Sequence, residues 1–197
     1  RVVELRHRGE GDRGVARVRV FGIDPGSERT GFGCVETDGT RYRVVTSGAV
    51  VVPRLSAFPD KLLAIHTQLA DLLGRSRPDC VAIENLFYSV NVRSALKLGH
   101  ARGVAMLAAV EHGVPVVEYT PAEIKRAVVG YGRAEKLQVQ AMVTLILGLS
   151  VPPTPYDASD ALAVAICHLH SHNHVGAATR RSTGKGKAAT SWRHYRP

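Results

Sequence analysis

The chain has 197 residues, of which 45% are hydrophobic, and this length and composition suit one globular domain with a well-buried core. Lysine and arginine number 26 against 17 aspartates and glutamates, and the resulting net charge of +9 favours a polyanionic partner such as nucleic acid. No apolar run reaches the roughly 20 residues that a membrane-spanning helix needs, so we expect a soluble, intracellular protein with no membrane role.

The two ends of the chain differ in composition from its middle. Residues 1–17 mix charge and glycine without sustained periodicity, and we expect a flexible arm or an extension there. Residues 171–197 carry six lysines or arginines and no acid in a background of serine, glycine and threonine, which predicts a basic disordered tail. The globular domain is therefore expected between residues 18 and 170.

The first half of this domain begins with β-rich sequence. Runs rich in β-branched residues and separated by turn signals cover residues 17–24, 32–37 and 41–52. They predict an antiparallel meander of three strands. Apolar residues then recur at helical spacing in residues 60–76, and the short apolar run at 80–85 predicts a fourth strand.

The second half alternates helical and extended patterns. The predicted elements are a helix at 92–113, a strand at 114–119, a short helix from Pro121, and helices at 134–148 and 156–170. Three strands followed by helix, strand, helix, strand and terminal helices predict an α/β fold. We expect a mixed five-stranded sheet, made of the meander plus parallel strands, with helices on its faces.

Asp24 closes the first strand, in the stretch "VFGIDPGSERTGFG". Asp24, Pro25 and Gly26 fit a β-turn, so the aspartate could merely shape the connection. Glu84 closes the strand "CVAIE" in the same manner. If a right-handed helical crossover makes these two strands parallel neighbours, the two acids lie side by side where ligands gather in such sheets.

Two more acids open the last predicted helix, in "YDASDALA". Asp157 and Asp160 are three residues apart and share a helix face. They could be an N-cap and an imperfect capping box. Together with Asp24 and Glu84 they instead suggest a metal site, because Mg²⁺ prefers carboxylate oxygens and two ions about 4 Å apart can clamp a phosphodiester. A basic protein with such a site suggests a nuclease.

Four segments resemble the RuvC family of Holliday junction resolvases, in the same order and at similar spacing: "GIDPGSERTGFG", "AIENLFYSVNVRSALKLGHARGV", "EYTPAEIKRAVVGYGRAEKLQVQAMV" and "DASDALAVAICH". The resemblance covers residues 18–170. It implies a ribonuclease H-like fold, a homodimer, and Mg²⁺-dependent symmetric cleavage of four-way DNA junctions in bacterial recombination and repair. The catalytic, metal-binding acids of the family fall on Asp24, Glu84, Asp157 and Asp160.

The same resemblance implies partners and cofactors that composition does not indicate. It implies two Mg²⁺ ions per active site, with Mn²⁺ as a possible substitute. It also implies that the protein works with the branch-migration proteins RuvA and RuvB, and that it is cytoplasmic and associated with the bacterial nucleoid.

Two lysines lie in the matching segments. Lys136 stands in the first turn of a predicted helix, where the helix dipole favours an acid rather than a cation. It could be a solvated lysine, but the resemblance implies that it stabilises charge on the transferred phosphate. Lys125 likewise corresponds to a phosphate contact in the family.

Candidate DNA contacts follow the fourth strand. Phe87 and Tyr88 could be buried anchors or could stack on bases that are unpaired at a junction, and the family places an aromatic residue at Phe87. Arg93 and Lys97 share a helix face that is either simply solvated or follows the DNA backbone. Gly99 and Gly103, further along that helix, permit close packing at a dimer interface or against the sheet.

Three other functions compete with this interpretation. An actin-like phosphotransferase also uses a strand ending in an aspartate and a glycine-bearing turn, but it needs a duplicated second half, for which 197 residues leave no room. Another ribonuclease H-like nuclease, acting on RNA, is disfavoured only by the resemblance. In a non-catalytic junction-binding protein, four converging acids would repel DNA phosphates.

Overall fold

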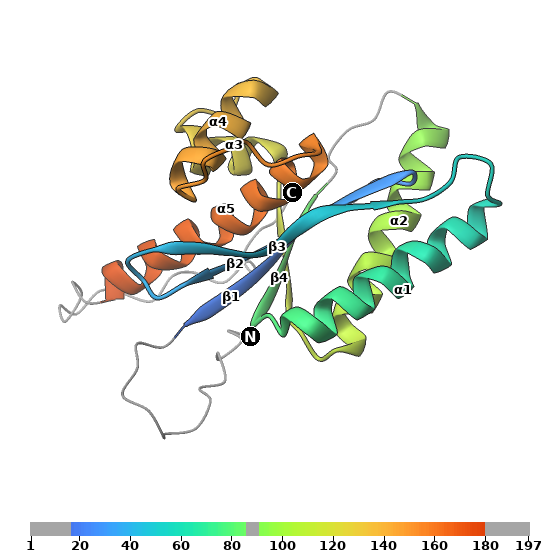
Figure 1. Cartoon of the computed structure of the whole chain (residues 1–197), viewed down its shortest axis with the longest axis horizontal. Coiled ribbons are helices and arrows are strands. Elements are labelled where there is room, and N and C mark those ends of the chain that lie inside the picture. Colours follow the sequence, from blue (N-terminus) through green and yellow to red (C-terminus); the bar gives the residue numbers. More distant parts are fainter. Residues whose placement is uncertain (1–16, 86–90, 180–197) are drawn as a thin grey trace, which may run out of the picture.

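The computed structural model describes residues 17–85 and 91–179 (Figure 1). The strands in these ranges are β1 (Val18–Asp24), β2 (Arg29–Thr37), β3 (Tyr42–Val51), β4 (Cys80–Glu84) and β5 (Val116–Tyr119). The helices are α1 (Phe58–Ser76), α2 (Val92–Glu111), α3 (Pro121–Val129), α4 (Lys136–Ile146) and α5 (Tyr156–Thr179). This is the predicted order of elements.

The strands form one mixed sheet with the spatial order β3-β2-β1-β4-β5. The pairs β1–β2 and β2–β3 are antiparallel, as expected for a meander. The pairs β1–β4 and β4–β5 are parallel, because each of the helices α1 and α2 returns the chain to the starting edge of the sheet. The predicted mixed five-stranded sheet is confirmed, and its central strand β1 has a parallel neighbour on one side and an antiparallel neighbour on the other.

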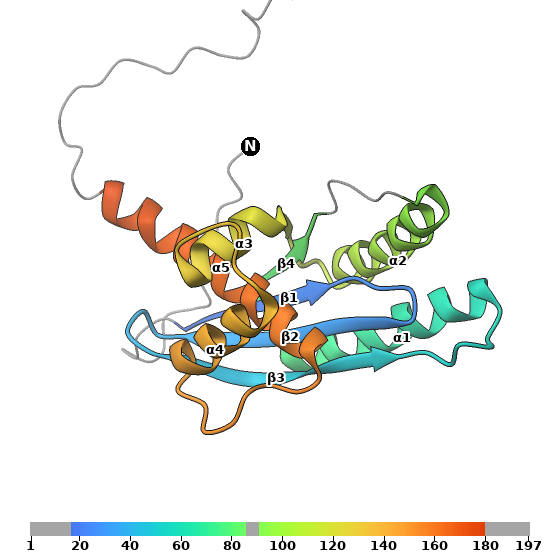
Figure 2. The same cartoon turned by 90° about the horizontal axis from the view of Figure 1, so that it is seen from above.

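Helices cover both faces of the sheet (Figures 1 and 2). Helices α1 and α2 pack on one face against Phe21 and Ile23, which are fully buried. Helices α3, α4 and α5 pack on the other face, against Val20 and Ala82. Because successive side chains of a strand point to opposite faces, the β1 residues after Val20 that face α5 are Gly22 and then Asp24. The end of β1 therefore directs Asp24 to the α5 side.

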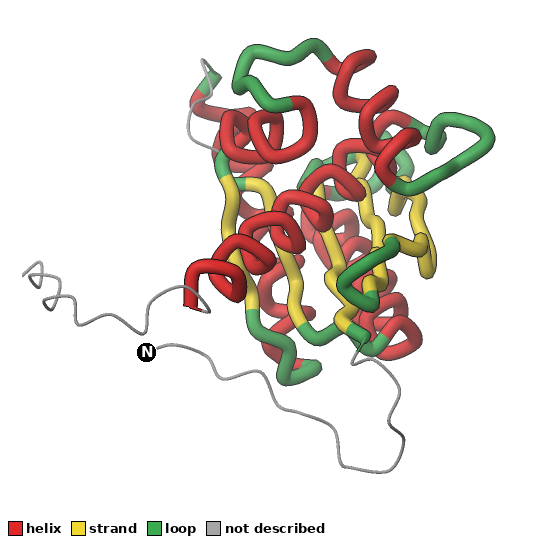
Figure 3. Tube along the Cα trace, turned by 90° about the vertical axis from the view of Figure 1, so that its left-hand side faces the viewer, coloured by secondary structure: helices red, strands yellow, loops and turns green. Residues whose placement is uncertain are grey.

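Helix α5 lies very close to the strands, and Figure 3 shows it crossing them diagonally. A Cβ atom added to Gly22 would come within 2.0 Å of the Ala161 carbonyl oxygen, and one added to Gly31 within 2.0 Å of the Asp157 carbonyl oxygen. Glycine is therefore required at both positions for this approach. The two contacts fix the first turns of α5 over β1 and β2.

Helix α5 is also longer than predicted. Residues 171–179, which we expected to belong to the disordered tail, are helical instead. The preceding turns are already anchored on the sheet, so extending the helix needs no new nucleation. In the part of the chain that the structure describes, no helix combines the length and hydropathy needed to cross a membrane.

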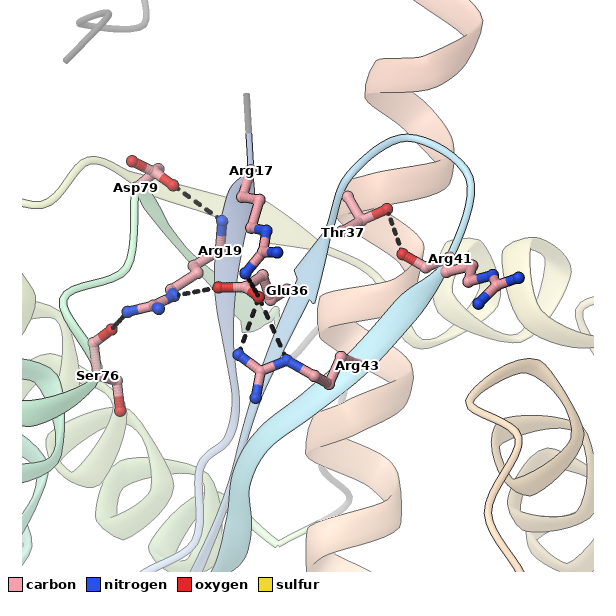
Figure 4. Close-up of polar contacts among 8 residues, drawn as sticks. All are labelled: Arg17, Arg19, Glu36, Thr37, Arg41, Arg43, Ser76 and Asp79. Carbon is pink, nitrogen blue, oxygen red and sulfur yellow. Dashed lines mark hydrogen bonds and ion pairs between the residues drawn. The ribbon is translucent and has the colours of Figure 1, made fainter. Parts of the chain in front are cut away.

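An ion-pair cluster closes the opposite end of β1 and β2 (Figure 4). The side chain of Glu36 is only 5% exposed and accepts hydrogen bonds from Arg19 Nε at 2.7 Å and Arg43 Nη2 at 2.9 Å. Arg17 lies 3.6 Å from the same carboxylate. Arg19 also donates to the carbonyl oxygen of Ser76 at the end of α1. We call these residues the Glu36 cluster: Arg17, Arg19, Glu36 and Arg43.

Candidate active site

Asp24 and Glu84 end two adjacent parallel strands. The register pairs Gly22 with Ala82 and Ile23 with Ile83, so the next position along the strands brings Asp24 beside Glu84. Because Ala82 faces α5, the strand alternation places Glu84 on the same side of the sheet as Asp24. The predicted side-by-side placement of the two acids is therefore what the strand register produces.

The two carboxyl groups share a hydrogen bond. Burial, followed by the negative charge of Glu84, raises the pKa of Asp24 to about 8. Burial likewise raises the pKa of Glu84, and the hydrogen bond from Asp24 acts against that rise. The raised pKa of Asp24 means that this carboxyl group keeps its proton at neutral pH and that the pair resists full ionisation.

The connection after Asp24 is tightly closed. The Thr30 hydroxyl, which is fully buried, donates to the Gly26 carbonyl oxygen at 2.8 Å and lies 3.3 Å from the Gly26 amide. A Cβ atom added to Gly26 would lie 1.9 Å from the Arg29 carbonyl oxygen, so only glycine fits there. Pro25 and Gly26 thus form the turn, and Asp24 stays at the strand end with its carboxyl group directed into the site.

Asp157 and Asp160 reach the same region from the first turns of α5. Both raise the pKa of Asp24 through their negative charge. The cap interpretation of Asp157 is wrong, because α5 begins at Tyr156 and Asp157 is already a helical residue. Its carboxylate lies 3.6 Å from the Arg29 guanidinium. We call the four acidic side chains the carboxylate site: Asp24, Glu84, Asp157 and Asp160.

Lys136 contacts the carboxylate site directly. It is the first residue of α4, and its Nζ donates to Asp160 Oδ2 at 3.2 Å. The start of α4 is fixed by the Glu135 backbone amide, which donates to Gln138 Oε1 at 2.8 Å. The negative charge of Asp160 is the first cause of the raised pKa of Lys136, so this lysine stays protonated. Its side chain is 74% exposed, which leaves it accessible to an incoming anion.

The remaining predicted residues differ in how close they lie to the carboxylate site. Lys125 in α3 is near enough for its charge to lower the pKa of Glu84. Arg93 and Lys97 are exposed on the first turns of α2. Phe87 and Tyr88 lie outside the described residues.

Sequence reasoning missed Arg29. The second strand was expected to begin at Phe32, but β2 begins at Arg29, whose backbone pairs with Val51 of β3. The strand pairing directs this arginine to α5, where it meets Asp157. The only signal in the sequence was a basic residue five positions after Asp24, and its partner lies 128 positions further along the chain.

The donor chemistry of the carboxylate site fits Mg²⁺, which favours hard oxygen ligands. Two buried carboxyl groups that share a proton are also a place where a divalent cation could replace that proton. Within residues 17–85 and 91–179, no three acid, histidine or cysteine side chains are positioned to hold one ion as they stand. Asp157 and Asp160 are paired with Arg29 and Lys136, so these pairs would have to open.

Comparison with known proteins agrees with this geometry. A family model described as "Crossover junction endodeoxyribonuclease RuvC" matches residues 20–168. A relative with this description from Trichlorobacter lovleyi is 49% identical over 183 residues, covering 91% of this chain and 100% of the relative. One from Ruminiclostridium cellulolyticum is 48% identical over 144 residues, covering 73% of this chain and 87% of the relative. The chain belongs to the RuvC family.

A solved RuvC structure supports the fold assignment. The structure of RuvC from T. thermophilus in complex with a Holliday junction substrate superimposes with a TM-score of 0.77 at 36% identity, covering 80% of this chain and 96% of that one. The predicted ribonuclease H-like fold and the predicted family are confirmed. Nucleases of the RuvC family are metal-dependent.

Proposed function

We propose that this RuvC-family protein cuts DNA at the carboxylate site. As a crossover junction endodeoxyribonuclease, the chain resolves four-way DNA junctions in homologous recombination and repair. The observation that carries the proposal is the placement of Asp24 and Glu84 side by side at the ends of adjacent parallel strands, where burial raises the pKa of both carboxyl groups. A buried acid pair of this kind is costly unless it binds a cation, and the two α5 acids lie beside it.

The four acids come from different elements of the fold, and we propose that all four bind the metal ions. Asp24 and Glu84 are held rigidly by the sheet, and Asp157 and Asp160 by the first turns of α5. Together they would hold two Mg²⁺ ions, with Mn²⁺ as a substitute. Bound there, the ions supply Lewis-acid stabilisation of charge on the phosphate oxygens and an activated water.

Lys136 and Lys125 balance charge at the same place. Without metal, Lys136 neutralises Asp160 at 3.2 Å. With Asp160 holding a cation, the exposed ammonium of Lys136 would be free to contact the scissile phosphate and would stabilise negative charge on it. Lys125, close to Glu84, contacts a neighbouring phosphate.

Junction recognition involves the segment that follows β4. Phe87 and Tyr88 come three and four residues after Glu84, where an aromatic ring could stack on a base that is unpaired at the junction centre. Arg93 and Lys97 are exposed and would follow the phosphate backbone. The basic C-terminal residues add phosphate contacts that do not depend on the DNA sequence.

Paired, symmetric cuts require two sites, and we assign the homodimer interface to the outer face of α2. An apolar cavity of about 510 Å³ lies between α1 and α2 and is lined in part by Leu62, Leu96 and Leu107. Leu96 and Leu107 are 59% and 50% exposed, and Gly99 and Gly103 have open space beside them. A second copy of this chain would cover these residues. RuvA and RuvB are the further partners, at the nucleoid.

The test is cleavage of a synthetic four-way junction beside a linear duplex, with Mg²⁺, with Mn²⁺ and with neither. The variants are Asp24→Asn, Glu84→Gln, Asp157→Asn and Asp160→Asn. Each should slow cutting by roughly 10²- to 10³-fold or more, the loss typical of removing a charge-stabilising group, while junction binding is kept or tightened.

Asp71→Asn is the matched control, because Asp71 is an exposed acid of α1 that pairs only with its neighbour Arg75 in the described residues. It should cut at the wild-type rate. Cutting without metal, or normal cutting by the Asp24 variant, would exclude the proposed mechanism.

A further inference from the structure

A pocket of about 620 Å³ opens directly beside Asp157. It lies between the start of β2, helix α4 and the loop at residues 151–155 that leads into α5. The ribbon of this loop runs below α4 in Figure 2. We call it the Arg29 pocket, and the lining residues used below are Arg29, Gln140, Val151, Thr154, Tyr156 and Asp157. Its volume is in the range of small-molecule sites, which includes single nucleotides.

The basic side of the pocket is Arg29. Its guanidinium lies 3.6 Å from Asp157 Oδ2, too far for a hydrogen bond, and its side chain is 55% exposed. A surface pair of this kind is weak, so Arg29 can exchange Asp157 for another anion at little cost. A guanidinium binds phosphate oxygens in a fork geometry.

The apolar side of the pocket is unusually open to solvent. Tyr156 is 51% exposed and Val151 is 69% exposed, although both are large hydrophobic residues. Tyr156 lines the same pocket as Asp157 of the carboxylate site. An exposed aromatic ring beside a cation matches a nucleotide, which presents a flat base and a phosphate.

Two polar groups on the wall can contact a base edge. The Gln140 side chain is held in place by Nε2, which donates to the Pro153 carbonyl oxygen at 2.9 Å. Thr154 carries a hydroxyl group on the same loop. Glutamine and threonine side chains are among those that read base edges.

We propose that the Arg29 pocket binds the nucleotide next to the scissile phosphate on the cleaved strand, and that it sets the sequence preference of cutting. Arg29 binds the phosphate of that nucleotide, Tyr156 stacks on its base, and Gln140 contacts the base edge. This inference rests on the proposed function, because the scissile phosphate must lie at the carboxylate site for its neighbour to reach the pocket.

The first experiment measures cleavage on a panel of junctions that differ in the base pairs on each side of the cut. Arg29→Gln should lower cleavage by a similar factor on every junction, roughly 10- to 100-fold, because a phosphate contact carries no sequence information. Gln140→Ala should instead reduce the ratio between the cleavage rates of preferred and disfavoured junctions. Arg54→Gln is the control for loss of charge, since Arg54 is 85% exposed and pairs with Glu28 away from the pocket.

The second experiment measures binding without metal, so that no cutting occurs. A junction carrying 2-aminopurine in place of each nucleotide flanking the cut reports stacking through its fluorescence. Tyr156→Ala should abolish the quenching at one of the two positions, and Tyr156→Phe should keep it. An abasic site at that position should weaken binding by wild type roughly 5-fold or more and should have no further effect on the alanine variant.

The outcomes separate the two hypotheses. If wild type cuts junctions but all pocket variants keep its rate, its sequence ranking and its fluorescence, the Arg29 pocket is not a nucleotide site and the inference is wrong. If wild type does not cut junctions, the proposed function itself fails. Thermal melting of each variant identifies those whose loss results from unfolding.

Discussion

Two carboxyl groups that end adjacent parallel strands cannot both ionise at low cost unless a cation lies between them. Asp24 and Glu84 are in this position, and in the metal-free protein burial and the charge of Glu84 raise the pKa of Asp24, so that Asp24 keeps its proton at neutral pH. Metal binding must remove that proton. Protonation and metal binding at Asp24 are therefore in competition, and the apparent pKa of Asp24 should fall below its metal-free value of about 8 as the Mg²⁺ concentration rises.

The pH dependence of stability follows from this pair. The folded-state pKa of Asp24 is raised from 3.8 to about 8, so its contribution to stability is fully present below the unfolded pKa and is lost as pH rises through about 8. The melting temperature of metal-free protein should therefore fall as pH rises from about 4 to about 8 and should level off above that. Asp24→Asn should flatten this fall, and Mg²⁺ should stabilise wild type more at the higher pH. An equal fall in the variant would place the titration elsewhere.

Residue by residue, the sequence was informative where a local rule applies. Asp24 and Glu84 could be predicted because a strand end is visible in the sequence and parallel strands bring such ends together. Asp157 could be grouped with them on the chemistry of Mg²⁺ binding and through the family resemblance, but no local rule placed the start of α5 beside the two strand ends. The contact between Lys136 and Asp160 could not be foreseen, since it depends on how α4 packs on α5, and the contact of Arg29 with Asp157 depends on where β2 begins.

At the scale of elements, the site depends on how closely α5 approaches the sheet. Gly22 and Gly31 allow that approach, and Gly31 meets the backbone of Asp157 itself. The sequence predicted the strands and the helix, but not their separation, because a glycine in a strand is equally compatible with a bulge. The short distance between α5 and the sheet is what brings Asp157 and Asp160 of the helix close to Asp24 and Glu84 at the strand ends.

Gly31→Ala tests this dependence. The added Cβ would lie 2.0 Å from the Asp157 carbonyl oxygen, so the first turn of α5 must move. We expect a loss of about 1–3 kcal/mol in the free energy of unfolding and a larger fall in cutting than in junction binding. Urea unfolding, cleavage and binding assays measure the three effects.

Gly74→Ala is the control, because its added methyl group meets its nearest neighbour, in His112, at an ordinary 3.5 Å. It lies in α1, so alanine should be neutral or slightly stabilising. A Gly31 variant that unfolds normally and cuts at the wild-type rate would show that α5 can adjust without disturbing Asp157.

At the scale of the whole molecule, the proposed homodimer places its interface and its active site on different sides of the sheet. The cavity between α1 and α2 lies on one face, and the α5 acids lie on the other. Cutting one strand should therefore not require the partner, whereas cutting two strands in a coordinated way should.

Leu96→Glu should separate these two properties. Leu96 is 59% exposed and lines the cavity, so a charge there should disrupt a dimer without disturbing the core. Sedimentation should show wild type as a dimer and the variant as a monomer that leaves junctions nicked in one strand. The control variant Leu145→Glu changes an exposed leucine of α4, far from the cavity, and it should stay dimeric. A monomeric wild type, or a dimeric Leu96 variant, would place the interface elsewhere.

At the end of β1 and β2 opposite the carboxylate site, the arginines of the Glu36 cluster should tolerate substitution better than Glu36 does. One buried carboxylate faces three arginines, so Arg43, whose side chain is 63% exposed, is partly redundant, and Arg43→Gln should cost less than about 1 kcal/mol. Glu36→Gln removes the one carboxylate that, among the described residues, pairs with all three of Arg17, Arg19 and Arg43, and it should cost about 3 kcal/mol. Urea unfolding of the two variants measures this asymmetry, and equal losses would contradict it. Among related sequences, substitutions should therefore be more frequent at the arginines of this cluster than at the position of Glu36.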